Sequence, residues 1–176
     1  MHFVKTKLKD VYIIELEKIE DERGFFARTW DVEKFKNIGL NSKIVQCNMS
    51  LSKQKGIIRG MHYQLEPHQE TKFLRCTKGA IYDVIVDLRK DSETFRQWLG
   101  VELTENNYRM LYVPKGFAHG FQTLELDTEV FYQVSEAYHP ESERGVRWDD
   151  PAFKISWPLE EKIISKKDMS HPKFIY

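Results

Sequence analysis

Two histidines lie beside glycines in short segments rich in apolar residues. His62 belongs to Ile58-Arg59-Gly60-Met61-His62-Tyr63-Gln64, and His119 belongs to Val113-Pro114-Lys115-Gly116-Phe117-Ala118-His119-Gly120. Each histidine is expected where a strand meets a glycine-bearing turn, because glycine permits close backbone approach and loops on a rigid sheet carry binding groups. An imidazole exchanges protons near neutral pH and also binds metals, so these segments predict acid–base chemistry or a metal site.

The metal-binding interpretation has partial support. The spacing from Pro114 to His119 is similar to the second motif of the cupin superfamily, jelly-roll proteins that often hold a metal with three histidines and a glutamate. The first motif would be His-x-His followed by Glu, whereas His62 is followed by Tyr-Gln and then by His68 and Glu70. Zinc and iron sites need imidazoles and carboxylates at fixed short spacing, so we expect no catalytic metal.

Alternation along predicted strands places two other polar groups inside the fold. Tyr132 shares a strand face with Val130 and Val134, which makes it an inward tyrosine whose hydroxyl needs a hydrogen bond and can donate a proton. Asp83 shares a face with Ile85. A carboxylate among apolar side chains requires a polar partner, so we expect one for Asp83.

The elements that must position these side chains are predicted to be mainly strands. From about Ser42 to Tyr138, β-branched and aromatic residues form short segments separated by Gly, Asn or Asp, at the spacing typical of sandwiches and barrels. One helix is expected from Asp31, its cap, to Ile38, and a short helical turn is expected after Pro158. The predicted fold class is all-β.

Composition limits the possible classes of protein. The 176 residues suit one domain over residues 1–176, and 41% hydrophobic with 13% aromatic residues exclude disorder for most of the chain. Equal numbers of basic and acidic residues, 27 each, disfavour binding to nucleic acid or to an anionic membrane. Apolar runs fall far short of the about 20 residues of a spanning helix, and the first residues do not open a signal peptide, so a soluble, cytoplasmic protein is expected. Cys47 and Cys76 predict no disulfide framework.

A series of ordered motifs spans nearly the whole chain. It comprises residues 21–26, Gln46, Asn48, 58–64, Lys72, 82–84, 86–89, 113–121, Tyr132, 138–141, 148–151, 157–158 and 165–168. Together these motifs closely resemble the dTDP-4-dehydrorhamnose 3,5-epimerase family of metal-free cupins. The resemblance implies a double-stranded β-helix, the cupin jelly roll, with a few short helices and no cofactor. It also implies a homodimer whose N-terminal strands join the neighbouring sheet, which would cover an edge that otherwise invites aggregation.

The chemistry implied by the resemblance is inversion of C3 and C5 beside the 4-keto group of a dTDP-linked 4-keto-6-deoxyhexose. The product, dTDP-4-dehydro-L-rhamnose, would serve the synthesis of surface polysaccharide such as lipopolysaccharide. His62 matches the family's base, Asp168 the partner that orients it, and Tyr132 the acid that returns a proton from the opposite face of the ring. Lys72 matches the cation that stabilises the enolate oxygen. This set suits the task, because a proton beside a ketone is weakly acidic and its removal needs a positioned base and a stabilised enolate.

Further positions match substrate contacts of the family. Arg59 and His119 resemble donors around the sugar and phosphates, Arg23 resembles a diphosphate contact, and Phe26 and Tyr138 could stack on the base. The remaining matched positions are Gln46, Asn48, Glu143 and Lys167. Two positions depart from the pattern, with Arg28 where the family commonly has Glu and Cys47 where it commonly has Asp. Reversing the charge at position 28 is expected to change how the nucleotide base is held.

Three alternatives stay open from the sequence. An enzyme of the same fold could invert only C3 or only C5, or take a related sugar nucleotide, with the same base and acid. A metal-dependent cupin oxygenase or isomerase would contain iron, manganese or zinc. A non-catalytic sugar-binding jelly roll would bind the nucleotide sugar without exchanging its hydrogens with solvent.

Overall fold

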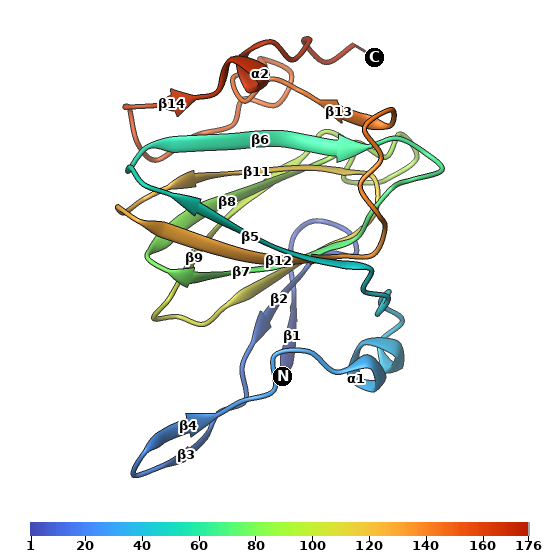
Figure 1. Cartoon of the computed structure of the whole chain (residues 1–176). Helices are drawn as coiled ribbons and strands as arrows, with labels where there is room; N and C mark the ends of the chain where they lie inside the picture. The colour runs from blue at the N-terminus through green and yellow to red at the C-terminus, as the bar shows by residue number, and fades with distance from the viewer. Residues whose placement is uncertain (176) are drawn as a thin grey trace.

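Two β-sheets face each other in a computed structural model that describes residues 1–175 (Figure 1). The first sheet has the spatial order β1 (His2–Lys5), β2 (Tyr12–Glu15), β10 (Met110–Val113), β7 (Lys72–Lys78), β12 (Thr128–Val134) and β5 (Gln46–Ser52). The second has the order β13 (Glu143–Gly145), β6 (Ile57–Gln64), β11 (Phe117–Thr123), β8 (Ala80–Asp87) and β9 (Trp98–Thr104), with β14 (Ile163–Ile164) parallel to β6. This architecture confirms the predicted all-β jelly roll.

The expected alternation holds along β8, and both of its faces are covered. Ile81 and Ile85 belong to the core cluster between the sheets, whereas Val84 and Val86 pack in a second cluster on the outer face. A strand buried on both sides has no solvated face, which explains its nearly continuous apolar sequence. Asp83 has the predicted partner, because its Oδ1 lies 2.8 Å from Nε2 of a histidine, His119, on the neighbouring strand β11.

One expected helix forms and the other does not. Helix α1 (Val32–Asn37) begins after Asp31, whose carboxylate accepts the N–H groups of two first-turn residues, and Ile38 caps its end. The turn predicted after Pro158 was wrong, because the backbone there binds a buried side chain: Gln122 Oε1 accepts the Leu159 N–H, and Gln122 Nε2 donates to the Leu159 carbonyl. A short helix that the sequence did not predict, α2 (Lys166–Met169), follows β14 instead.

The two candidate histidines lie inside strands, not at strand ends as expected. His62 of β6 is paired directly with His119 of β11. A Cβ atom on Gly60 would lie 2.6 Å from the Gly120 Cα, and one on Gly120 would lie 2.6 Å from the Arg59 carbonyl oxygen. The two glycines therefore mark a close contact between adjacent strands, not a turn.

A hairpin of β3 (Ile19–Asp21) and β4 (Gly24–Phe26) projects from the body of the molecule (Figure 1). Its apolar side chains are open to solvent, with Ile19 68% and Phe26 64% exposed. Two strands precede it: β1 pairs with β2, and β2 pairs with β10 of the same chain. Of the four strands before α1, only β3 and β4 thus pair with neither of the two large sheets.

Two smaller expectations can also be compared with the structure. Cys47 is exposed and Cys76 is buried, and both are free thiols, as expected. No helix within residues 1–175 has the length and hydropathy needed to cross a membrane.

Candidate active site

A cavity with two lobes opens between the sheets. The larger lobe has a volume of about 510 Å³ and the smaller one about 320 Å³. His62, Lys72 and Tyr132 line both lobes, so they stand where the lobes meet. His62 comes from β6 of one sheet, and the other two come from β7 and β12 of the facing sheet. The structure thus brings together the four residues that the sequence assigned to catalysis, since Asp168 also lines the larger lobe.

The imidazole of His62 is held by Asp168. His62 Nε2 lies 2.7 Å from Asp168 Oδ1, and the second carboxylate oxygen accepts the Gly60 N–H at 3.2 Å. Burial opposes ionisation of Asp168, but the hydrogen bond and positive charge of His62 outweigh it and lower the pKa of this carboxyl. An ionised carboxylate accepts the Nε2 proton, which leaves the lone pair of a neutral imidazole on Nδ1.

Helix α2 supplies Asp168 to this pair. Ser165 caps the helix by accepting the Asp168 N–H through its hydroxyl oxygen at 3.0 Å. The Asp168 side chain is buried, with 6% of its surface exposed. The preceding strand, β14, runs beside β6, so the chain returns to His62 after crossing most of the fold.

A second histidine near this pair escaped the sequence analysis. The His171 ring packs edge-on against His62 with centroids 5.5 Å apart, and its Nε2 lies 3.5 Å from Asp168 Oδ1. This Nε2 is buried and makes no hydrogen bond within residues 1–175. Burial and the neighbouring His62 charge lower the pKa of His171. His171 follows Ser170, the C-cap of α2, so no periodic pattern in the sequence marks it, and only its spacing of three residues from Asp168 could have pointed to the contact.

The facing sheet presents a phenol and an ammonium. Tyr132 packs partly against the core, and its hydroxyl makes no hydrogen bond within the described part of the chain, contrary to expectation. Desolvation and the charge of Glu70 raise the pKa of Tyr132, which keeps the phenol protonated. Lys72 Nζ is paired with Glu70 Oε1 at 2.7 Å, and both side chains are largely buried. This pair was not predicted from the sequence, where Glu70 was weighed only as a metal ligand.

Two further predicted donors line the larger lobe, each fixed by a neighbour. Arg59 Nε donates to Ser52 Oγ at 3.0 Å, and its Nη2 donates to the Leu51 carbonyl at 3.1 Å. His119 Nε2 lies 2.8 Å from Oδ1 of the buried Asp83, as described above. Because each group already has a partner, its orientation is set before any ligand binds.

The smaller lobe collects predicted substrate-binding residues from both sheets. Its predicted members are Gln46, Asn48, Tyr138 and Glu143, and Lys167 reaches it from α2 by pairing with Glu143 at 2.7 Å. The Tyr138 hydroxyl donates to the same carboxylate at 2.8 Å. These contacts make one network, in which burial opposes ionisation of Glu143 but Lys167 and Tyr138 lower its pKa.

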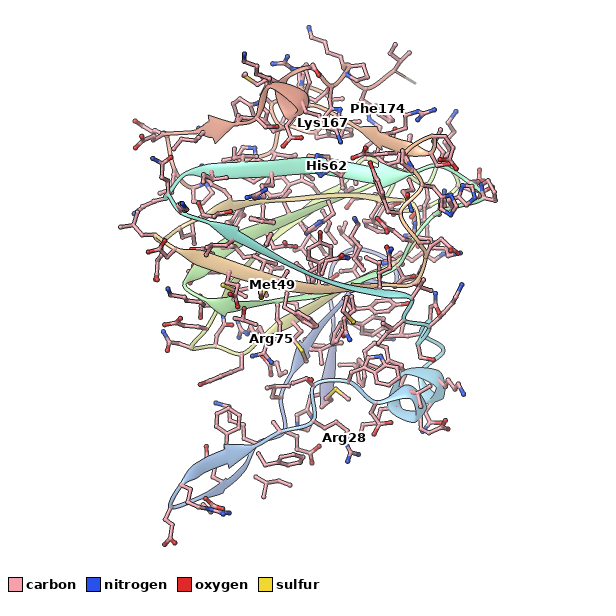
Figure 2. All side chains as sticks on the ribbon, in the orientation of Figure 1. Arg28, Met49, His62, Arg75, Lys167 and Phe174 are labelled. Carbon is pink, nitrogen blue, oxygen red and sulfur yellow. The ribbon has the colours of Figure 1, made fainter. Side chains whose placement is uncertain are left out.

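Three predicted substrate contacts, Arg23, Phe26 and Arg28, do not line this cavity, so their role in substrate binding stays a prediction. Arg23 and Phe26 belong to the projecting β3–β4 hairpin, and the Arg23 side chain is 84% exposed and pairs with Asp21. Arg28 pairs with Asp31 at 3.0 Å, at the start of α1. Figure 2 places Arg28 at the end of the molecule opposite His62 and Lys167. The hairpin carries Arg23 and Phe26 away because its strands pair only with each other.

The metal-ligand set considered from the sequence does not assemble. His62 binds Asp168, Glu70 binds Lys72, and His68 stacks on His139. Two other groups of three side chains in residues 1–175 have ligand atoms close enough to hold an ion. They are His62, Asp168 and His171 in the cavity, and His68, His139 and Glu141 in loops.

Known proteins are similar to this chain over almost its full length. The family model described as dTDP-4-dehydrorhamnose 3,5-epimerase matches residues 5–175. A dTDP-4-dehydrorhamnose 3,5-epimerase of Shigella flexneri is 42% identical, over 99% of this chain and 97% of the relative. A dTDP-4-dehydrorhamnose 3-epimerase of Streptomyces niveus is 34% identical, over 92% and 78%.

Solved structures show the same fold. A dTDP-4-dehydrorhamnose 3,5-epimerase from Elizabethkingia anophelis NUHP1 superimposes with a TM-score of 0.96 at 42% identity, covering 99% of this chain and 96% of that one. A dTDP-6-deoxy-D-glucose-3,5-epimerase from Legionella pneumophila Philadelphia 1, in complex with dTDP-4-keto-L-rhamnose, has a TM-score of 0.90 at 38% identity, covering 97% and 90%.

Proposed function

This chain belongs to the dTDP-4-dehydrorhamnose 3,5-epimerase family, and we propose that it inverts C3 and C5 of dTDP-4-dehydro-6-deoxy-D-glucose to give dTDP-4-dehydro-L-rhamnose. It is thus an isomerase of dTDP-rhamnose synthesis. One observation carries the proposal: His62 of one sheet, paired with Asp168 of α2, and the Tyr132 phenol of the other sheet line one cavity. A substrate between them has a base on one side of its ring and an acid on the other.

Proton removal falls to His62. Its Nδ1 takes the hydrogen from the carbon beside the ketone, and the electron pair of that C–H bond moves into the enolate. The imidazolium that forms stays hydrogen bonded to Asp168, whose negative charge stabilises it. General base catalysis of this kind contributes about 10²–10⁴-fold to a rate.

Lys72 stabilises the enolate oxygen. Its ammonium lies at the junction of the two lobes and is largely buried, where a charge interacts more strongly than in water. Glu70 holds this ammonium in place in the free enzyme. The ketone oxygen approaches the same ammonium when the sugar binds.

Tyr132 completes the inversion. Its hydroxyl proton passes to the carbon from the face opposite His62, so the new C–H bond points the other way. The raised pKa of Tyr132, due to desolvation, keeps this proton in place until the enolate forms. A single base acting alone would return the proton to its original face.

We also propose a homodimer in which the β3–β4 hairpin reaches the cavity of the neighbouring chain. The first N-terminal strands, β1 and β2, pair with β10 of their own chain and not with a neighbouring sheet as expected. The hairpin projects with exposed apolar side chains, which supports an exchange through this part of the N-terminal region. Arg23, Phe26 and Arg28 would then contact the nucleotide in the partner's site, which accounts for their distance from His62. A planar guanidinium suits a diphosphate, because it binds two oxygens at once.

The test is NMR of the nucleotide sugar with the pure enzyme in heavy water. Full epimerase activity places deuterium at C3 and at C5 and gives the L-rhamno product. A binding module would leave both hydrogens in place, which would contradict the proposed chemistry. Activity that vanishes after metal removal and returns with added metal would instead favour a metal-dependent cupin.

A C3-only epimerase is the second candidate. It is supported by the 34% identity to the 3-epimerase of Streptomyces niveus, although identity to the 3,5-epimerase of Shigella flexneri is higher, at 42%. The same base and acid serve both reactions, and the number of centres inverted depends on how the sugar turns in the cavity. Deuterium at C3 alone in the same NMR experiment would favour this candidate.

A further inference from the structure

The residue of β13 that faces the candidate base is a glycine. Gly145 is the direct partner of His62 across the β13–β6 pair. Directly opposed residues of an antiparallel pair point their side chains to the same face, with Cβ atoms about 4.5–5.5 Å apart. A side chain at position 145 would therefore stand beside the His62 imidazole, and a glycine leaves that place open.

The imidazole ring of His171 occupies this place. A Cβ atom on Gly145 would collide with three atoms of that ring, Cε1, Nε2 and Cδ2. The ring packs edge-on against His62, with centroids 5.5 Å apart and planes at 76°, and 11% of the His171 side-chain surface is exposed. His171 lines neither lobe of the cavity, so any effect on a bound sugar passes through His62.

We propose that His171 is a positioning residue for the base: its ring, seated against Gly145, keeps the His62 imidazole aligned with Asp168. The inference rests on the proposed function, in which His62 removes the proton. The hydrogen bond of 2.7 Å to Asp168 fixes one nitrogen of His62 but leaves the ring free to tilt about it. Packing against the ring removes this freedom, and a reacting group must be held within about 0.5 Å of its productive geometry.

The His62 ring has a neighbour on each adjacent strand. On β11, its direct partner is His119, whose Nε2 lies 2.8 Å from Oδ1 of the buried Asp83. On β13, its direct partner is Gly145, which has no side chain to offer. His171 thus supplies from outside the sheet the neighbour that β13 lacks.

The segment that carries His171 is tied down on either side of it. Arg147 Nη1 donates to the Met169 carbonyl at 3.3 Å. Asp150, which is 3% exposed, accepts the Phe174 N–H through Oδ2 at 2.7 Å. Both of these side chains follow β13 in the chain, so the strand that leaves room for the ring also leads into the residues that fix its segment. A ring held in this way restrains its neighbour and does not move with it.

Packing of the ring, not a hydrogen bond, carries the role. His171 Nε2 lies 3.5 Å from Asp168 Oδ1, but it is a buried atom that makes no hydrogen bond within residues 1–175. The same oxygen is already held by His62 Nε2 at 2.7 Å. An aromatic ring without nitrogen should therefore serve as well as imidazole, whereas an amide without a ring should not.

The experiment compares His171→Phe, His171→Gln and His171→Ala in steady-state kinetics with the dTDP-linked keto sugar. We expect kcat to fall about 10–100-fold in the Gln and Ala variants with KM unchanged, because a misplacement of about 1 Å costs up to roughly 10²-fold. His171→Phe should retain a kcat near that of the wild type. Rates are expressed per binding site counted by calorimetric titration with dTDP, so that a loss of folded protein does not imitate slow catalysis.

Gly145→Ala displaces the same ring by a second route. Its methyl group pushes the His171 ring aside, so this variant should also lower kcat. In the double variant with His171→Ala, the methyl group enters an empty place, so kcat should be no lower than in His171→Ala alone. Effects that multiply would overturn the proposal, as would a wild-type kcat in His171→Ala. A Phe variant as slow as the Ala variant, or a Gln variant faster than both, would assign the role to the nitrogen and overturn it too.

NMR of isotope-labelled histidine side chains tests the alignment without turnover. The Nε2 proton of His62, assigned by its loss in His62→Ala, should be protected from exchange with water in the wild type and in His171→Phe. It should exchange faster in His171→Ala, and unchanged protection there would overturn the proposal. If the wild type does not epimerise the sugar, the proposed function fails, and this signal still decides whether His171 holds His62. Should His171→Phe not fold, the Gly145→Ala cycle and this signal carry the test.

Discussion

At the scale of single residues, one carboxylate organises the candidate base. Asp168 accepts hydrogen bonds from His62 and from the Gly60 backbone, and a second histidine, His171, lies 3.5 Å from it. The ring of His62 therefore cannot turn without breaking a contact of about 2.7 Å to a buried charge. This restraint keeps one imidazole nitrogen directed at the cavity.

Replacing His62 by Ala should abolish most of the turnover. The proton would lack a positioned acceptor, so kcat should fall by about 10²–10⁴-fold while KM changes little. Steady-state kinetics with the dTDP-linked keto sugar measures both constants. A variant with nearly wild-type kcat would remove His62 from the mechanism.

Tyr132→Phe should separate the two halves of the reaction. The variant keeps the aromatic ring and its packing but lacks the proton donor, so hydrogen exchange with solvent should continue while inversion slows by about 10²-fold or more. Deuterium incorporation and product formation are followed in the same NMR sample. If both rates drop equally, Tyr132 positions the substrate and does not deliver the proton.

His171 should make the fold sensitive to acid. Because burial and His62 lower its pKa, the native state binds this proton less readily than the unfolded chain does. The unfolded chain then carries more protons below about pH 6.5, so the free energy of unfolding falls as the pH drops through this range. His171→Gln should reduce that loss between about pH 7 and 5.5, measured by urea unfolding. An unchanged pH dependence would contradict the assignment, and His2→Gln is the control.

At the scale of elements, adjacent strands bring the histidines together. His62 and His119 are direct partners across β6 and β11, and Gly60 and Gly120 beside them let the backbones touch. The alternation of apolar residues predicted these strands, their faces and the inward Tyr132, and the motifs predicted the residues that meet in the cavity. The prediction of a glycine-bearing turn is right for Gly116, which lies in the turn before β11 with a φ of 81°. It is wrong for Gly60 and Gly120, because a sequence does not show whether a glycine lies in a turn or against another strand.

Other parts of the site depend on tertiary contacts that no local pattern carries. Helix α2 has four residues, too few for a periodic signal, yet it positions Asp168. The pairing of Lys72 with Glu70 and the packing of His171 on His62 need the finished fold. Arg23 matched a substrate contact by motif, but its hairpin points away from the chain's own cavity.

Gly120→Ala tests the contact between β6 and β11. The new methyl group would lie 2.6 Å from the Arg59 carbonyl oxygen, so β6 must move away and carry His62 with it. We expect a loss of roughly 1–3 kcal/mol in the free energy of unfolding, together with a lower kcat. Denaturant unfolding and kinetics measure these effects. Gly39→Asn is the control, because that position is open and asparagine tolerates its positive φ of 75°; equal effects of both variants would contradict the close-contact argument.

At the scale of the whole molecule, the cavity and the hairpin are two halves of one proposed site. The cavity holds the residues proposed as base, acid and enolate-binding cation, whereas the hairpin carries the guanidinium proposed for the diphosphate. A chain whose hairpin leaves its own site can complete the site of a second copy, and a two-fold axis makes the exchange reciprocal. Dimerisation would then be a requirement for catalysis as well as a cover for exposed apolar residues.

Mixing two inactive variants tests this exchange directly. His62→Ala removes the base and keeps the hairpin, whereas Arg23→Glu reverses the charge on the hairpin and keeps the base. If hairpins act across the dimer, a mixed dimer has one site with both groups intact, and random pairing of equal amounts should restore about a quarter of wild-type activity. Co-expression with two different affinity tags, followed by tandem purification, isolates the mixed dimer, which should have about half the wild-type rate. If the hairpin acted within its own chain, no mixed dimer would hold a complete site, and its activity would stay at the level of the two parents.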